Sequence, residues 1–220
     1  MKKTILVWHM HELKIGFNDE RIHQTLTALE KNGFQTFFVS NKDEALDKVL
    51  SLIPSNASVG FGGSVTLREI NLIDALTARG NTVFEHWSQP EENITSIMRK
   101  QLNSDVFVAS SNAVTEDGKL INIDKAGNRV AAMIFGPKRV ILVIGTNKIV
   151  KDLEEGIRRI RNIAAPMNAK RRGDKTPCTT TGTCTDCESP DRVCRVITIL
   201  EKKPSRTDIT VILLGEELGF

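Results

Sequence analysis

Short apolar runs alternate along this chain with segments whose apolar residues recur every three to four positions. The first pattern is typical of buried strands and the second of amphipathic helices. Strands alternating with helices predict an α/β fold with a mainly parallel sheet flanked by helices, joined by right-handed crossovers. The predicted strands cover residues 34–40, 59–61, 82–86, 105–110, 139–145, 196–200 and 208–214, the last two completing the sheet. The predicted helices cover 18–32, 41–53, 64–79, 90–103 and 152–163, with another entered at 127–129.

Residues 1–16 form an N-terminal extension for which the pattern favours a helix over a strand. The apolar run before His9 and His11 is too short for a signal-peptide core or a membrane span. The two histidines are two positions apart, which does not place them on one side of a helix, so we expect solvated side chains and no metal pair. A cytoplasmic protein with no membrane contact is the expectation.

A glycine-rich turn, GFGGS, follows the predicted strand at 59–61. Glycines allow tight backbone geometry, and a helix N-terminus behind them is a favourable seat for phosphate or carboxylate. The motif is neither the dinucleotide fingerprint nor a Walker A loop, since no Lys follows the last glycine. It is therefore either an anion-binding loop or a tight connection that binds nothing. The residues concerned are Gly60, Gly62, Gly63 and Ser64, with Thr66 and Glu69 spaced as a capping box that opens the helix.

The second informative stretch covers residues 111–148 and contains a predicted hairpin, with a tight turn at Glu116, Asp117 and Gly118 between strands at 113–115 and 119–123. Ligands of parallel sheets lie beyond the carboxyl ends of the strands, where this stretch and the glycine turn can meet. Glu116 and Asp117 are the candidate catalytic carboxylates. An exposed hairpin with solvated charges is the alternative. The further candidate ligand-binding residues are Thr115, Asn122, Asn128, Arg129, Asn147 and Lys148.

The composition narrows the expected partners. The length of 220 residues fits a single domain over residues 1–220 with a substantial core. The formal net charge is only +3, and the chain has two Trp and no Tyr. Nucleic-acid surfaces are usually strongly basic, and single-strand binding usually uses aromatic side chains. We therefore expect no nucleic-acid partner, whereas the oligomeric state, including a homo-oligomer, stays open.

All four cysteines, Cys178, Cys184, Cys187 and Cys194, lie within a basic and cysteine-rich insertion, residues 168–195, predicted to be a loop. Four thiolates suit a tetrahedral zinc site or an iron–sulfur cluster. Only one CxxC pair is present, so the spacing matches neither a two-CxxC zinc ribbon nor the bacterial ferredoxin motif. Reduced free thiols, or a dithiol that cycles through a disulfide, are the alternatives.

Four motifs together resemble the LUD family, the lactate-utilisation proteins related to lactate-utilisation protein C. They are GFGGSVTLRE, VTEDGKLINID, GNRVAAMIFGPKRVILVIGTNKIV and KKPSRTDITVILLGEELG. The resemblance implies a fold like that of ribose-5-phosphate isomerases and CoA-transferases, in which a glycine-rich loop handles an anionic group. It also implies a part in oxidising L-lactate to pyruvate beside iron–sulfur partner subunits. The cysteine segment departs from the simplest family pattern.

The leading hypothesis is a LUD-family protein that binds a small anionic metabolite and holds an iron–sulfur cluster, or else zinc, through its four cysteines. The family's link to redox metabolism favours iron–sulfur. A second hypothesis is a non-redox isomerase, transferase or ligase that uses Glu116 or Asp117 as general base or nucleophile. A third is a non-catalytic accessory subunit of an iron–sulfur oxidoreductase complex.

Overall fold

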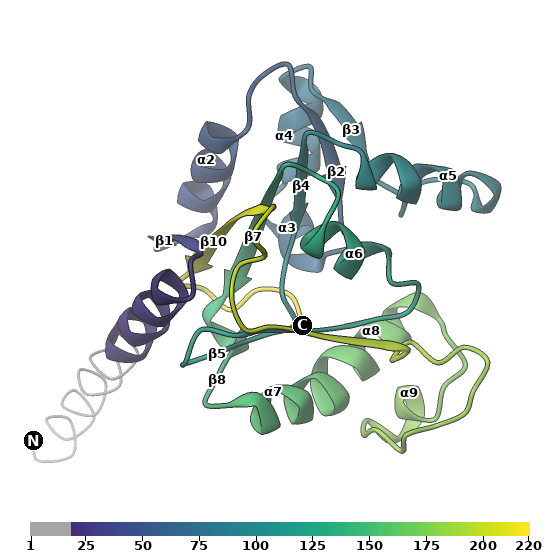
Figure 1. Cartoon of the computed structure of the whole chain (residues 1–220). Coiled ribbons are helices and arrows are strands. Elements are labelled where there is room, and N and C mark those ends of the chain that lie inside the picture. Colours follow the sequence, from purple (N-terminus) through teal and green to yellow (C-terminus); the bar gives the residue numbers. More distant parts are fainter. Residues whose placement is uncertain (1–18) are drawn as a thin grey trace, which may run out of the picture.

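The computed structural model describes residues 19–220, and a six-stranded sheet lies at its centre (Figure 1). Every pair of neighbouring strands runs parallel, in the order β1-β10-β7-β4-β2-β3. The predicted α/β class with a mainly parallel sheet is thereby confirmed. The strands are β1 (Gln35–Val39), β2 (Ser58–Phe61), β3 (Thr82–Phe84), β4 (Val106–Ala109), β7 (Arg139–Gly145) and β10 (Asp208–Leu214).

Helices cover both faces of this sheet because its central strands are apolar on both sides. One face packs against α2 (Lys42–Leu52), α3 (Val65–Glu69) and α4 (Leu72–Ala78). The other face packs against a helix over residues 19–31, the end of α5 (Glu91–Leu102), and α6 (Asn128–Ile134). β4 and β7 are buried almost throughout, as strands covered on both faces are.

A second, four-stranded sheet lies against this other face, in the order β8-β5-β6-β9. Its strands are β5 (Ala113–Thr115), β6 (Leu120–Asp124), β8 (Ile149–Val150) and β9 (Val196–Leu200), and β5 with β6 forms the predicted hairpin. The prediction that both C-terminal strands complete the parallel sheet is wrong for β9, which pairs antiparallel with β6. β9 alternates half-buried and exposed residues, whereas β10 is buried almost throughout, and this difference suits an edge strand and a central strand respectively.

Two helix predictions need correction. The single helix expected at 64–79 is two helices, because Asn71 adopts a left-handed conformation between α3 and α4. Ser64 caps α3 by accepting a hydrogen bond from the Leu67 N–H at 3.3 Å, so the capping box predicted for Thr66 and Glu69 does not form.

The basic and cysteine-rich segment predicted as a loop, residues 168–195, is partly helical. α7 (Leu153–Arg159) continues through a π-helical turn, η2 (Ile160–Ala164), into α8 (Ala165–Arg172). Pro166 directly follows this π-helical turn, and because it has no N–H it cannot continue the regular α-helical hydrogen bonding at that point. The lower part of Figure 1 shows α7 and α8 beneath the second sheet, with the short α9 (Cys178–Thr181) beyond them.

The predictions for His9, His11 and the extension of residues 1–16 lie outside the described residues. Within residues 19–220, no helix combines the length and the apolar character that a membrane span requires.

Candidate functional site

An open cavity of about 190 Å³ lies at the carboxyl edge of the parallel sheet. Three connections meet there because β2, β4 and β7 run parallel and in register. They are the glycine turn after β2, the segment 110–112 after β4, and the 3₁₀ turn η1 (Thr146–Lys148) after β7. The end of β6 and helix α8 contribute further walls. The cavity thus has room for a small metabolite in the place that a parallel sheet favours.

Lys148 is the central cation of this cavity, and the residue is only 3% exposed. Its Nζ donates to Thr66 Oγ1 at 2.9 Å and to Ser110 Oγ at 3.0 Å. Burial, together with the like charges of Arg159 and Arg129, lowers the pKa of Lys148 to about 7. The amine is therefore poised between its charged and neutral forms, as is common for functional lysines.

Arg129 also lines the cavity, but its guanidinium is occupied by the protein. Its nitrogens donate to the Ser110 and Ile123 carbonyls and to Oδ1 of Asn122 and Asn112, and its Nε lies 3.4 Å from Asp124 Oδ2. A guanidinium has five N–H donors; four of them are engaged in these hydrogen bonds, and the fifth, on Nε, faces Asp124 at ion-pair distance. Arg129 thus fixes the walls of the cavity and is not free to bind a ligand.

His86 lies in the cavity wall just beyond β3. Gln101 Nε2 donates to the Phe84 carbonyl at 3.0 Å, which orients its amide and makes His86 Nδ1, also at 3.0 Å, an acceptor. Burial lowers the pKa of His86 below its ordinary value, which favours the neutral ring. The proton of that neutral ring is therefore on Nε2, as a donor in a wall of the cavity.

Further cations come from the turn between β6 and α6 and from the end of α8. Lys125 and Arg172 both pair with Asp174, at 2.8 and 2.9 Å, while the Arg171 guanidinium stacks 3.8 Å from the centroid of a Trp87 ring. All three cations line the cavity. Together with Lys148 they give it a positive character, which suits an anionic ligand.

The glycine turn is shaped by packing. The Gly62 N–H donates to the Val108 carbonyl at 2.9 Å, and a Cβ on Gly62 would lie 2.9 Å from Arg129 Cγ. A Cβ on Gly63 would collide with the indole of Trp87. Side chains at both positions are thus excluded by close neighbours.

The predicted ligand-binding residues divide into two groups. Six of them line the cavity, namely Gly63, Ser64, Thr66, Asn128, Arg129 and Lys148. The others do not line the cavity. Gly60 lies within β2, and Asn122 Oδ1 accepts hydrogen bonds from the Arg129 guanidinium and the Asn112 N–H. Glu69 and Asn147 bind the backbone of residues 218–219.

The turn at Glu116, Asp117 and Gly118 does not reach the cavity. Arg21 pairs with Glu116 at 2.5 Å, and Asp117 pairs with Lys119 at 2.9 Å. Thr115 is buried beside them, with its hydroxyl bonded within the turn. Gly118 packs directly against the backbone of residues 28–29. The structure therefore does not bring Thr115, Glu116 or Asp117 to the glycine turn, and this part of the expected convergence is wrong, whereas Asn128, Arg129 and Lys148 of the same stretch do line the cavity beside the glycine turn.

His86 and Trp87 are cavity residues that the sequence interpretation missed. The available signal was their position directly after a predicted strand, at the same edge of the sheet as the glycine turn. Arg171 and Arg172 belong to the basic segment within residues 168–195, and the structure places both in the cavity wall.

The four cysteines are free and half-buried, and all of them line one small cavity together with Arg161 and Arg192. Burial raises the pKa of Cys194 to about 11, and the neighbouring Cys184 and Cys178 act in the same direction. The donor types fit a four-thiolate centre. Within the described residues, however, no three His, Cys, Asp or Glu side chains are arranged to hold one metal ion. Binding therefore requires the loop to draw its sulfurs together.

The fold and the cavity define an α/β protein with a cationic site at the carboxyl edge of a parallel sheet. The model of the LUD domain matches residues 22–214, so the chain belongs to the LUD domain family. This confirms the resemblance seen in the motifs. None of the curated proteins matches the chain.

A solved structure supports the fold. The chain is similar to a DUF162 family protein from Deinococcus radiodurans, with a TM-score of 0.55 and 15% sequence identity. The match covers 90% of this chain and 98% of that one.

Proposed function

We propose that this LUD-family protein binds a small anionic metabolite in the carboxyl-edge cavity and takes part in L-lactate utilisation in the cytoplasm. The observation that carries the proposal is the buried Lys148 in a cavity whose other walls supply Arg171, Arg172 and Lys125. A carboxylate that enters gains charge-assisted hydrogen bonds from these cations. The family connection supplies lactate and pyruvate as the first ligands to examine.

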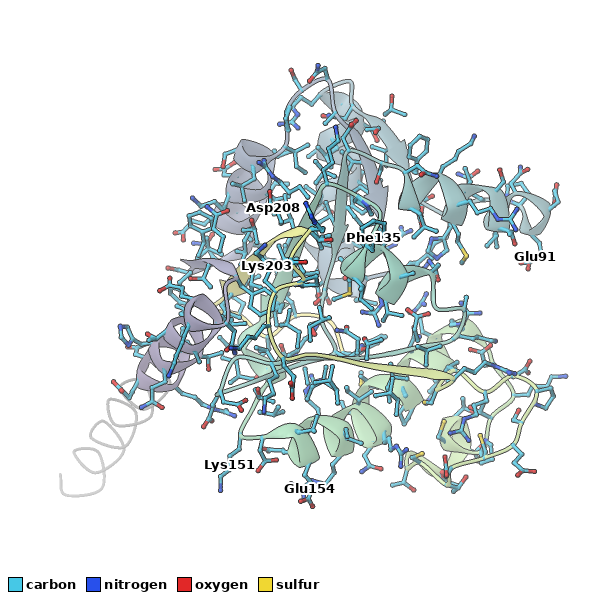
Figure 2. The ribbon with its side chains drawn as sticks, in the orientation of Figure 1. Glu91, Phe135, Lys151, Glu154, Lys203 and Asp208 are labelled. Atoms are coloured by element: carbon cyan, nitrogen blue, oxygen red, sulfur yellow. The ribbon has the colours of Figure 1, made fainter. Side chains whose placement is uncertain are left out.

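Calorimetric titration with L-lactate, pyruvate and inorganic phosphate tests this proposal. Replacing Lys148 by Met should weaken binding by about tenfold or more, since a hydrogen bond to a charged group is worth roughly 1.5–3 kcal/mol. Lys151→Met is the matched control, because Lys151 is exposed near the start of α7 and points outward (Figure 2). Equal affinities for both variants, or no binding by the native protein, would reject the anion site.

We further propose that the four cysteines hold a metal centre, with an iron–sulfur cluster as the leading candidate and zinc as the alternative. Support comes from the convergence of all four thiols on one cavity beside Arg161 and Arg192. The positive charges of these arginines oppose the burial that raises the pKa of Cys194. A cluster supplies one-electron transfer, whereas zinc supplies a structural link.

The two cavities share a wall. Ala165 and Val193 line both the anion cavity and the cysteine cavity. This adjacency favours a joint role in redox chemistry with iron–sulfur partner subunits. Anaerobic purification followed by iron, zinc and sulfide analysis is the test, and a colourless, metal-free protein would remove this part of the proposal.

A further inference from the structure

We propose that Lys148 forms a covalent imine with a small carboxylate that also carries an aldehyde or keto group. This inference rests on the proposed anion site, because the same cavity must hold the carboxylate. It assigns Lys148 the role of a nucleophile and not only that of a cation.

The hydrogen bonds around Nζ leave one position on the nitrogen unused. The Thr66 hydroxyl is in reach of the Leu218 carbonyl, and the Ser110 hydroxyl is in reach of the Ser111 carbonyl, each at 3.4 Å. With their protons directed to those carbonyls, both hydroxyl oxygens accept from Lys148. A neutral amine has two N–H donors, so both are engaged and the lone pair remains available.

The surrounding charges favour that neutral amine. Within residues 19–220, no carboxylate lies at ion-pair distance from Nζ. The positive charges of Arg159 and Arg129 act on the Lys148 amine and lower its pKa, and the negative charge of Glu69 acts in the opposite direction. Glu69 itself accepts a hydrogen bond from the Gly219 N–H. Burial lowers the pKa of Lys148 to about 7, so about half of the amine is neutral near that pH. A desolvated lysine next to other cations is a recognised form of activated amine nucleophile.

The proposed step balances without an external reagent. The amine nitrogen attacks the carbonyl carbon, and a carbon–nitrogen double bond replaces the carbon–oxygen double bond. The carbonyl oxygen leaves as water with the two hydrogens of the amine, and no electrons are exchanged. The Thr66 and Ser110 hydroxyls, at 2.9 and 3.0 Å from the nitrogen, are placed to pass these protons.

The cavity also selects the class of compound. Lys125, Arg171 and Arg172 line it, so a carboxylate on the carbonyl compound has cationic partners. A small 2-oxo acid combines both groups within a molecule that suits a cavity of about 190 Å³.

Reductive trapping tests the proposal directly. The full-length protein is incubated with glyoxylate, reduced with sodium borohydride, digested and mapped by mass spectrometry. We expect the reduced adduct on Lys148, in more than about tenfold excess over the exposed Lys151, because the neutral fraction of an amine rises tenfold for each pH unit by which its pKa is lowered. The yield should rise with pH and reach half its maximum near pH 7.

The outcomes separate this inference from the anion site. Binding of glyoxylate by calorimetry without an adduct on Lys148 would overturn the imine and leave the anion site standing. No binding at all would overturn both. Lys148→Arg keeps a cation but cannot form an imine, so it should retain binding and lose trapping. If that variant does not fold, the adduct map of the native protein still decides.

Discussion

The buried amine of Lys148 predicts a specific dependence of stability on pH. Its pKa falls from 10.5 to about 7 on folding, mainly through burial. Between these values the unfolded chain binds more protons than the folded protein, so this group makes the folded state more stable as the pH rises. Integrating the proton difference gives a gain of about 2 kcal/mol in the free energy of unfolding from about pH 7 to about pH 9.

The assay is urea unfolding at several pH values, followed by circular dichroism, for the native protein and for Lys148→Met. We expect the difference in free energy of unfolding between the two to grow by about 2 kcal/mol over this range in favour of the native protein. Other groups, including Cys194, are common to both proteins and cancel in the comparison. Lys151→Met, which removes an exposed charge, should run parallel to the native protein. If the curve for Lys148→Met also runs parallel to that of the native protein, the pKa of Lys148 is not lowered on folding.

Three further predictions concern the walls of the two cavities. Arg129→Met should lower the free energy of unfolding by about 3–5 kcal/mol in urea titrations, because it leaves buried carbonyls and Asp124 without their partner; a loss below about 1 kcal/mol would contradict this role. Ser64→Ala should cost about 1 kcal/mol in the same assay, as the loss of a helix cap does, and an unchanged value would argue against the cap. The double variant Cys184→Ser and Cys187→Ser should abolish metal binding. It should leave the circular dichroism spectrum unchanged, because both residues lie outside the described strands and helices. Full metal content in this double variant would exclude the two cysteines as ligands.

Much of the fold was predictable from local pattern. The observed bounds of β7, β9 and β10 match the predicted ones, because each is a run of β-branched and apolar residues bounded by polar or turn residues. The pairing of these strands was harder to predict. β9 pairs with β6, which is distant in the sequence, and the alternation of half-buried and exposed residues in β9 does not indicate its partner strand. The break between α3 and α4 depends on the left-handed conformation of Asn71. The helical spacing of apolar residues continues across this break, so the sequence pattern alone predicts one helix.

The candidate site was predictable in part. Lys148 and the glycine turn follow strands, and the topology alone brings the ends of those strands together. Glu116 also belongs to a polar turn near a strand end, but it pairs with Arg21 of the helix over residues 19–31, which only the tertiary structure reveals. A polar turn that lines the cavity and one that packs against another helix look alike in sequence. What distinguishes them is the element that packs against each turn, and this is set by the tertiary structure.

The proposed function depends on the binding of a small anion in the carboxyl-edge cavity through Lys148. Its most direct test is a crystal structure of the protein grown with saturating L-lactate. We expect electron density for the carboxylate within hydrogen-bonding distance of Lys148 Nζ. Density only outside the cavity, for instance beside Arg21 and Glu116, or an empty cavity at saturation, would contradict it.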